Sequence, residues 1–314
     1  MKSTIKDIEQ LTALYFDKDA LRIQPEMLYR RDIGGNRYYY TLDEDLNPKF
    51  YVSVTTLIHK TLATSPHLIE WIANTGLEEA EKIKNERSVY CTCMHALFNQ
   101  LLINRQLSLN DEDLELFIDN VLYSEKDTYG MTAKSMVYEL RRDLLSFAQF
   151  VIDYDVKPLA IELCLKSDKL GIAGAIDLIC SMNWRGARIN AVIDYKSNRE
   201  GNFYIAHEIQ VHIYKDLTEE NLKDIKIHTV FNFSPKNWTK KPTYTLKDQN
   251  KSKFSKILPH LMAIHESSLP INEYSDIKYK ENVMLNLDDP KSIADCFDIK
   301  NISERVKENH ENNH

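Results

Sequence analysis

The sequence predicts an α/β fold, and its second half supplies the two main observations. After Pro158, three β-rich segments follow in close succession, PLAIELCLKS, GIAGAIDLICSM and ARINAVIDYKS, with short polar connections typical of antiparallel hairpins. A helical pattern at about 203–217, an apolar strand at about 225–233 and a helical pattern at about 246–266 come next. Strands followed by helices in this order are typical of a sheet covered by helices.

The first half of the chain is predicted to be mainly helical after an initial hairpin. Residues 37–58 place two aromatic and β-branched runs around a polar connection, which favours strand, turn and strand. Ser65 as N-cap, Pro66 at the first helical position and Gly76 as the stop predict a helix between them. Apolar spacing then predicts further helices from about 77 to 150.

We expect three parts along the chain. An N-terminal region, 1–84, would hold the hairpin and first helices and pack on a core at 85–270. The extension at 271–314 ends in ERVKENHENNH, which is polar and has no apolar partner to bury, so we expect a disordered tail.

Composition excludes several classes of protein. No stretch approaches the roughly 18 apolar residues of a membrane helix, and MKSTIKDIEQ lacks the apolar segment of a signal peptide, so we expect a cytoplasmic protein without a membrane partner. The five cysteines are scattered and form no CxxC pair, which argues against a disulfide scaffold and a zinc ribbon.

The net charge of −7 is unevenly distributed. Residues 221–260 carry nine lysines against two aspartates, which gives +7 in this window. Aromatic residues alternate with these lysines, so cations for phosphates lie beside rings that could stack on bases. Phe231 and Phe233 are better explained as core strand residues. The better candidates for DNA contacts follow in the loop SPKNWTKKP: Lys236, Trp238, Lys240 and Lys241.

The segment from Ile172 to Ser197 carries the most informative polar residues. Asp177 ends one β-rich run, and Asp194 stands near the end of another. Because strand side chains alternate, Asp194 and Lys196 share one face, and a hairpin would bring Asp177 near them. Two carboxylates beside a lysine on an apolar sheet are costly to bury unless a divalent cation compensates. The segment therefore predicts a metal site with an ammonium beside it.

Phosphodiester hydrolysis uses these parts, since a metal lowers the pKa of a bound water and a lysine orients that water or stabilises phosphoryl charge. The alternative for Asp194 and Lys196 is a surface ion pair on a half-exposed strand. His95 lies on a helical line of apolar residues, where a satisfied core histidine is the alternative. Gln210 and Tyr214 are i, i+4 neighbours, and Gln210 would otherwise cap a local backbone group.

Taken together, the motifs resemble the RecB-like branch of the PD-(D/E)XK nuclease superfamily. The resemblance covers roughly residues 50–235, and YVSVTTLI before a helix with Trp71 resembles the opening of phage members. Its motifs occur in order: CTCMHALFN with His95, IELCL with Glu162, GIAGAIDLI with Asp177, VIDYKS with Asp194 and Lys196, and EIQVHIY with Gln210 and Tyr214. It implies a restriction-endonuclease-like core over 85–270, with a central mixed sheet of about four to five strands flanked by helices.

The resemblance also implies residue roles. The metal ligands would be His95, Asp177, Asp194 and the backbone carbonyl of Tyr195, with Glu162 as an outer member reaching the metal through water. Lys196 would be the catalytic lysine, while Gln210 and Tyr214 would support the site or contact DNA. The cofactor would be Mg²⁺ or Mn²⁺, and a histidine ligand favours manganese. No iron–sulfur cluster is expected, because the C-terminal part has only Cys296.

The implied activity is that of a metal-dependent deoxyribonuclease, an exonuclease or end-processing enzyme of phage or mobile-element recombination or replication. Because the chain has no helicase segment, a helicase, single-strand-binding or recombination protein would be its partner on DNA. Alternatives are an endonuclease on the same site, or a DNA-binding or assembly protein that has lost the reaction. The presence of His95, Asp177, Asp194 and Lys196 together favours an enzyme. A phosphatase or nucleotidase is disfavoured, because no Gly-rich phosphate loop is present.

Overall fold

The computed structural model describes residues 28–33, 35–44, 48–125, 127–250 and 256–268, together with the backbone of 275–279 and 297–301. The predicted disordered tail and Cys296 lie outside these residues. Within them, Cys91, Cys93, Cys164 and Cys180 are thiols that take part in no disulfide bond.

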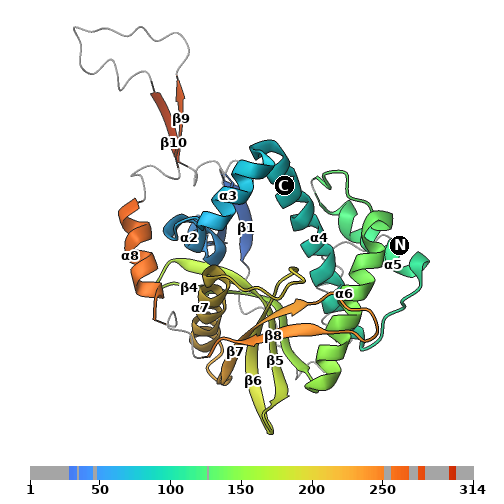
Figure 1. The fold of residues 1–314 in the computed structure, drawn as a ribbon. Helices are drawn as coiled ribbons and strands as arrows, with labels where there is room; N and C mark the ends of the chain where they lie inside the picture. Colours follow the sequence, from blue (N-terminus) through green and yellow to red (C-terminus); the bar gives the residue numbers. More distant parts are fainter. Residues whose placement is uncertain are drawn as a thin grey trace, which may run out of the picture.

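The described residues form one mixed sheet of eight strands, flanked by helices, which confirms the α/β prediction (Figure 1). Pairs β3–β5 and β6–β7 are parallel, and the remaining pairs are antiparallel. In spatial order the strands are β1 (Tyr29–Ile33), β2 (Asn36–Leu42), β3 (Pro48–Ser53), β5 (Ile172–Trp184), β6 (Ala187–Tyr195), β7 (Thr229–Pro235) and β8 (Tyr244–Asp248), with β4 (Lys157–Ser167) paired to β5. Five of these strands, β4 to β8, lie within 85–270, where four to five were expected, and β1 to β3 of the N-terminal region join the sheet because β3 pairs with β5.

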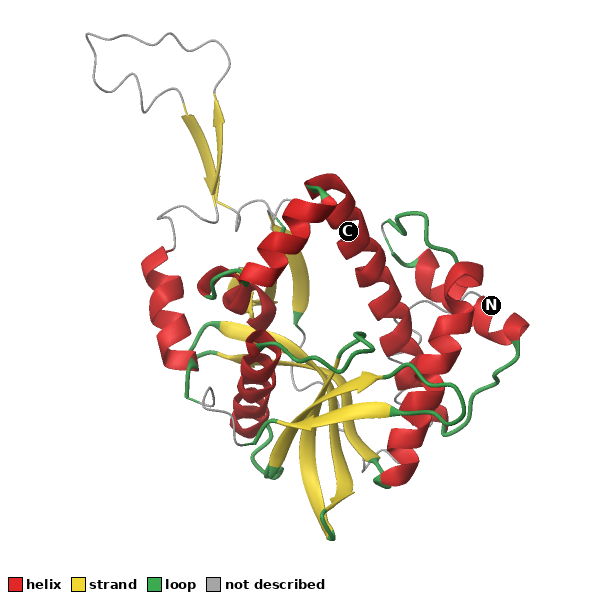
Figure 2. Ribbon diagram, in the orientation of Figure 1, coloured by secondary structure: helices red, strands yellow, loops and turns green. Residues whose placement is uncertain are grey.

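Helices cover both faces of the sheet, so each face has its own hydrophobic core (Figure 2). The first core involves α4 (Leu77–Asn104), α5 (Asp111–Tyr123) and α6 (Ala133–Asp153). The second involves α2 (Val54–Thr61), α7 (Ile205–Asn221) and α8 (Leu258–Ser268). The remaining elements are α3 (Pro66–Thr75) and an antiparallel pair formed by β9 (Ser275–Tyr279) and β10 (Phe297–Asn301).

Several predicted elements are confirmed, together with the local interactions that were expected to form them. The Ser65 hydroxyl accepts a hydrogen bond from the Leu68 N–H at 3.2 Å, and Gly76 ends α3 with φ of 87°. The three β-rich segments after Pro158 form β4, β5 and β6 as consecutive antiparallel strands. Helix α4 runs through residue 84, where the predicted boundary between N-terminal region and core falls.

Two predicted elements are corrected. The helix expected over 246–266 begins only at Leu258, because residues 244–248 instead form β8 along β7. The Tyr244 ring packs on Phe233 with centroids 5.8 Å apart, which holds this strand on the first core. The second strand of the hairpin ends at Ser53, whose hydroxyl accepts from the Thr56 N–H at 3.0 Å and so starts α2 within the VTTLI run.

No helix among the described residues has the length and apolar character needed to cross a membrane.

Candidate metal centre and its lysine

The candidate site lies at a kink shared by β4 and β5. Ile161 pairs with Leu178 and Leu163 pairs with Ile176, so Glu162 and Asp177 face each other between these pairs. Ile161 and Leu178 pack on the core of α4 to α6, whereas Leu163 and Ile176 pack on the core of α7. The alternation therefore reverses at this position in both strands. Glu162 has φ of 48°, a left-handed conformation that is strained for a non-glycine residue and typical of functional sites.

A histidine and two carboxylates converge at this kink. His95 Nδ1, from α4, lies 3.3 Å from Glu162 Oε1 and 3.6 Å from Asp177 Oδ1. One ligand atom from each of the three side chains lies within 4.8 Å of the others. An imidazole with two carboxylates fits Mn²⁺ or Mg²⁺, so the residues present suit the implied cofactor. Glu162 is a member of this group, and its implied role as an outer residue that reaches the metal through water stays a prediction.

The charges of the three residues depend on one another. Burial raises the pKa of Asp177 to about 7, against the attraction of His95. Burial acts to lower the pKa of His95, but Asp177 and Glu162 outweigh it and raise this pKa to about 9. Partial burial acts to raise the pKa of Glu162, but its hydrogen bond with His95 holds it below the usual value. The carboxylates of Glu162 and Asp177 can therefore both be ionised at this short distance only with a positive charge between them.

Asp194 and Lys196 form a buried ion pair on the neighbouring strand. Asp194 is 1% exposed, and Lys196 Nζ lies 2.8 Å from Asp194 Oδ2 and 3.2 Å from Gln210 Oε1. The surface-pair alternative is therefore wrong. As the strand alternation predicts, Tyr195 points to the opposite face, where its ring meets His95 edge-on at 5.3 Å.

The predicted hairpin brings Asp177 and Asp194 to adjacent positions. The pair Leu178–Ile193 stands next to them in the β5–β6 ladder, and Asp177 Oδ2 accepts the Tyr195 N–H at 2.6 Å. Asp194 is outside the three-residue group, since Lys196 and Asn232 engage its carboxylate. The roles of Asp194 and the Tyr195 carbonyl as metal ligands stay predictions.

Gln210 and Tyr214 support the lysine from α7. Gln210 accepts from Lys196 through Oε1 and donates through Nε2 to the Tyr214 hydroxyl at 2.8 Å. The alternative that Gln210 caps a backbone group is wrong. The Tyr214 ring lies on Gly174, where a Cβ atom would come within 2.7 Å of Tyr214 Cε1.

The close contact between Gly174 and the Tyr214 ring allows the packing of Tyr214 to be tested. We expect Gly174→Ala to lower the free energy of unfolding by about 1–3 kcal/mol, because the buried Tyr214 ring must move. Urea unfolding measures the cost. In a Tyr214→Leu background the same substitution should cost less than about 0.5 kcal/mol. An equal cost in both backgrounds would show that Tyr214 is not the obstacle.

Three polar residues that support the site were missed in the sequence. Asn99 donates to Glu162 Oε1 at 3.2 Å, Asn232 donates to Asp194 Oδ2 at 2.8 Å, and Gln249 donates to Asn232 Oδ1 at 2.9 Å. Asn99 follows His95 by one helical turn, and Asn232 interrupts the apolar run VFNF. The positions of Asn99 and Asn232 in the sequence were the features from which their supporting roles could have been predicted. Gln249 follows β8, and its contact depends on the β7–β8 pairing.

The predicted DNA-contacting lysines lie between β7 and β8, where Lys236, Lys240 and Lys241 are exposed. Trp238 is half-buried there, with the Arg142 guanidinium 4.8 Å from its ring centroid and its Nε1 donating to the Arg142 carbonyl at 3.4 Å. Helix α6 thus already contacts this indole, and DNA contact by Trp238 stays a prediction. Phe231 and Phe233 are fully buried, which confirms them as core residues.

Comparison with known proteins adds little to this geometry. No family model and no curated protein matches the chain. A solved structure named "Crystal structure of SSO0001" is similar at a TM-score of 0.24 and 15% sequence identity, covering 55% of this chain and 82% of that chain. A similarity this weak shows neither fold nor function.

Proposed function

We propose that the protein is a divalent-metal-dependent deoxyribonuclease that hydrolyses phosphodiester bonds on a restriction-endonuclease-like core. One observation carries the proposal: His95, Glu162 and Asp177 converge at the sheet kink while Lys196 is held on the adjacent strand. An imidazole, carboxylates and an ammonium are the parts that metal-assisted phosphodiester hydrolysis requires. Its expected role is end processing in phage or mobile-element recombination or replication.

His95, Glu162 and Asp177 would hold Mg²⁺ or Mn²⁺, and the ion would supply a water of lowered pKa and offset phosphate charge. The protein's own part is to position an ammonium. Asp194 and Gln210 hold Lys196 Nζ, which is a three-donor group that can also reach a phosphoryl oxygen or the attacking water. Because Asn232 fixes Asp194 in turn, the ammonium is oriented before substrate arrives.

The exposed lysines of the β7–β8 connection extend the proposal to DNA binding. Lys236, Lys240 and Lys241 would contact backbone phosphates, which is a sequence-independent mode of binding. Ser234, at the end of β7, donates to the Asn198 carbonyl in the segment that follows Lys196. The lysine-bearing loop therefore begins beside the candidate site.

Cleavage assays on two DNA topologies test the function. We expect purified protein to degrade linear DNA with Mg²⁺ or Mn²⁺, to spare covalently closed circular DNA, and to be inactive with a chelator. Nicking of the circle would instead identify an endonuclease on the same site. Salt-sensitive DNA binding without cleavage by either metal would contradict the enzyme and favour the binding-protein alternative.

A further inference from the structure

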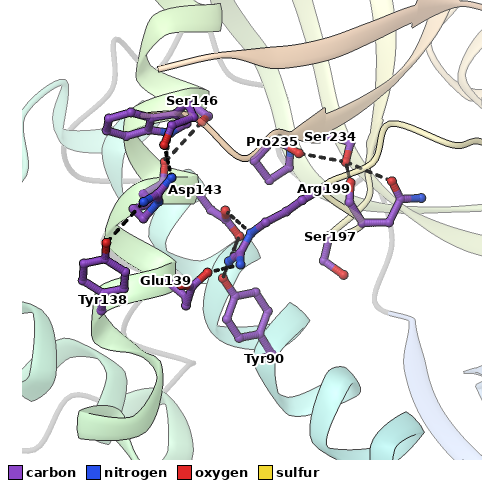
Figure 3. Close-up of polar contacts among 12 residues, drawn as sticks. Tyr90, Tyr138, Glu139, Asp143, Ser146, Ser197, Arg199, Ser234 and Pro235 are labelled. Atoms are coloured by element: carbon purple, nitrogen blue, oxygen red, sulfur yellow. Dashed lines mark hydrogen bonds and ion pairs between the residues drawn. The ribbon is translucent and has the colours of Figure 1, made fainter. Parts of the chain in front are cut away.

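The segment that follows Lys196 is anchored to both long helices of the first core. The Arg199 side chain lies among Tyr90 of α4 and Glu139 and Asp143 of α6 (Figure 3). Its Nε donates to Asp143 Oδ1 at 2.9 Å, and its Nη2 donates to the Tyr90 hydroxyl at 2.7 Å. Asp143 is only 1% exposed, so this is a desolvated ion pair and not a surface contact.

Further contacts fix the same segment along its length. Arg87 donates to the Ser197 carbonyl, and Ser234 donates to the Asn198 carbonyl. The Gly201 N–H donates to Asn198 Oδ1 at 3.0 Å. Residues 197–202 are therefore anchored to α4, α6 and β7 just before the residues that follow.

This anchored segment leads to apolar side chains that face solvent. Tyr204 is 61% exposed and Ile205 is 52% exposed, and Phe203 beside them is half-buried. Neighbouring apolar side chains that face solvent together form an apolar surface to which a ligand can bind. We call Phe203 and Tyr204 the aromatic lip.

The aromatic lip lies beside the candidate site. The Tyr204 and Phe203 ring centroids are 5.4 Å and 6.3 Å from that of His207, and the Tyr204 N–H donates to His207 Nδ1 at 3.3 Å. Burial and the positive charge of Lys196 lower the pKa of His207 to about 3, which favours the neutral form of this ring. Asn232 also connects His207 to the candidate site, because its side-chain amide donates to the His207 carbonyl and to Asp194.

We infer that Tyr204 stacks on an unpaired base of the strand that is cut, so that the preferred substrate is single-stranded DNA or a frayed end. This inference rests on the proposed nuclease function. Base faces are buried in the stack of an intact duplex, whereas an unpaired base offers its face to an aromatic side chain. A base stacked on the Tyr204 ring, which contacts His207, would hold the neighbouring phosphate near the candidate metal centre.

The test compares Tyr204→Ala with Tyr204→Phe, which keeps the ring, and with Tyr123→Ala, which removes a 78% exposed tyrosine from α5 on the other face of the sheet. The substrates are a single-stranded oligonucleotide and a blunt duplex of the same sequence. Cleavage is measured with Mn²⁺, and affinity is measured by fluorescence anisotropy in chelator. Because Tyr204 is exposed, all three variants should melt near the wild-type temperature.

We expect Tyr204→Ala to lose about tenfold in both affinity and kcat/KM for the single strand, as one lost base stack predicts, while both controls stay within about twofold. Removing one base at a time from the strand should cost the wild type about tenfold at one position and cost Tyr204→Ala nothing more there. Single-strand values for Tyr204→Ala within about twofold of wild type, or a wild-type preference for the blunt duplex, would overturn the inference. Absence of cleavage by the wild type would count against the nuclease function alone, because the affinity in chelator still decides on stacking.

Discussion

Replacing Lys196 should remove turnover and leave metal affinity nearly unchanged. The ammonium contacts Asp194 and Gln210 and lies outside the group formed by His95, Glu162 and Asp177. We expect Lys196→Ala to slow single-turnover cleavage of linear DNA by about 10²–10³-fold, the loss typical of one preorganised donor. Calorimetric titration with Mn²⁺ should give an affinity close to that of wild type.

Folding must be separated from chemistry in this experiment, because Lys196→Ala leaves Asp194 buried without its cation. Lys196→Gln keeps a donor for Asp194 and should restore the melting temperature without restoring cleavage. Lys157→Ala, which removes an exposed lysine from β4, serves as the matched control. Cleavage by Lys196→Ala at the wild-type rate would show that this ammonium has no part in the reaction.

The second large effect is expected at Asp177. Asp177→Asn keeps a side-chain oxygen that can accept the Tyr195 N–H, so we expect the fold to be retained. The variant loses the negative charge that would hold a cation beside His95 and Glu162. Metal-supported cleavage should disappear, and the rise in melting temperature that Mn²⁺ gives to the wild type should fall to near zero.

Asp168→Asn is the matched control for this charge, since Asp168 is 56% exposed between β4 and β5 and pairs with Lys49 and Lys166. It should respond to Mn²⁺ as the wild type does. An undiminished thermal response in Asp177→Asn would show that the ion binds elsewhere, and the proposed ligand group would then be wrong.

Strand alternation explains why much of the site could be predicted. It places Asp194 with Lys196 and sends Tyr195 to the other face, and both positions are confirmed. The proximity of Glu162 to His95 and Asp177 does not follow from alternation, because the left-handed backbone of Glu162 reverses the alternation along β4. A single residue with a strained backbone cannot be recognised from the two-residue alternation of a strand sequence.

The missed and mistaken features depend on pairing between distant segments. Asn232 reaches Asp194 only because β7 lies parallel to β6, with Asn232 and Asp194 in register. The stretch near Tyr244 forms a strand because the edge of β7 and the rings of Phe150 and Phe233 are available to it. Local composition favours a helix there, and tertiary packing overrides it.

The kink between β4 and β5 has a consequence for how the protein is controlled. His95 and Tyr195 belong to elements packed in the first core, whereas Gln210 and Tyr214 come from the helix packed in the second. The candidate residues meet only when both cores are assembled around the sheet. A newly synthesised or partly opened molecule would lack half of the arrangement, so the proposed reaction would begin only once folding is complete.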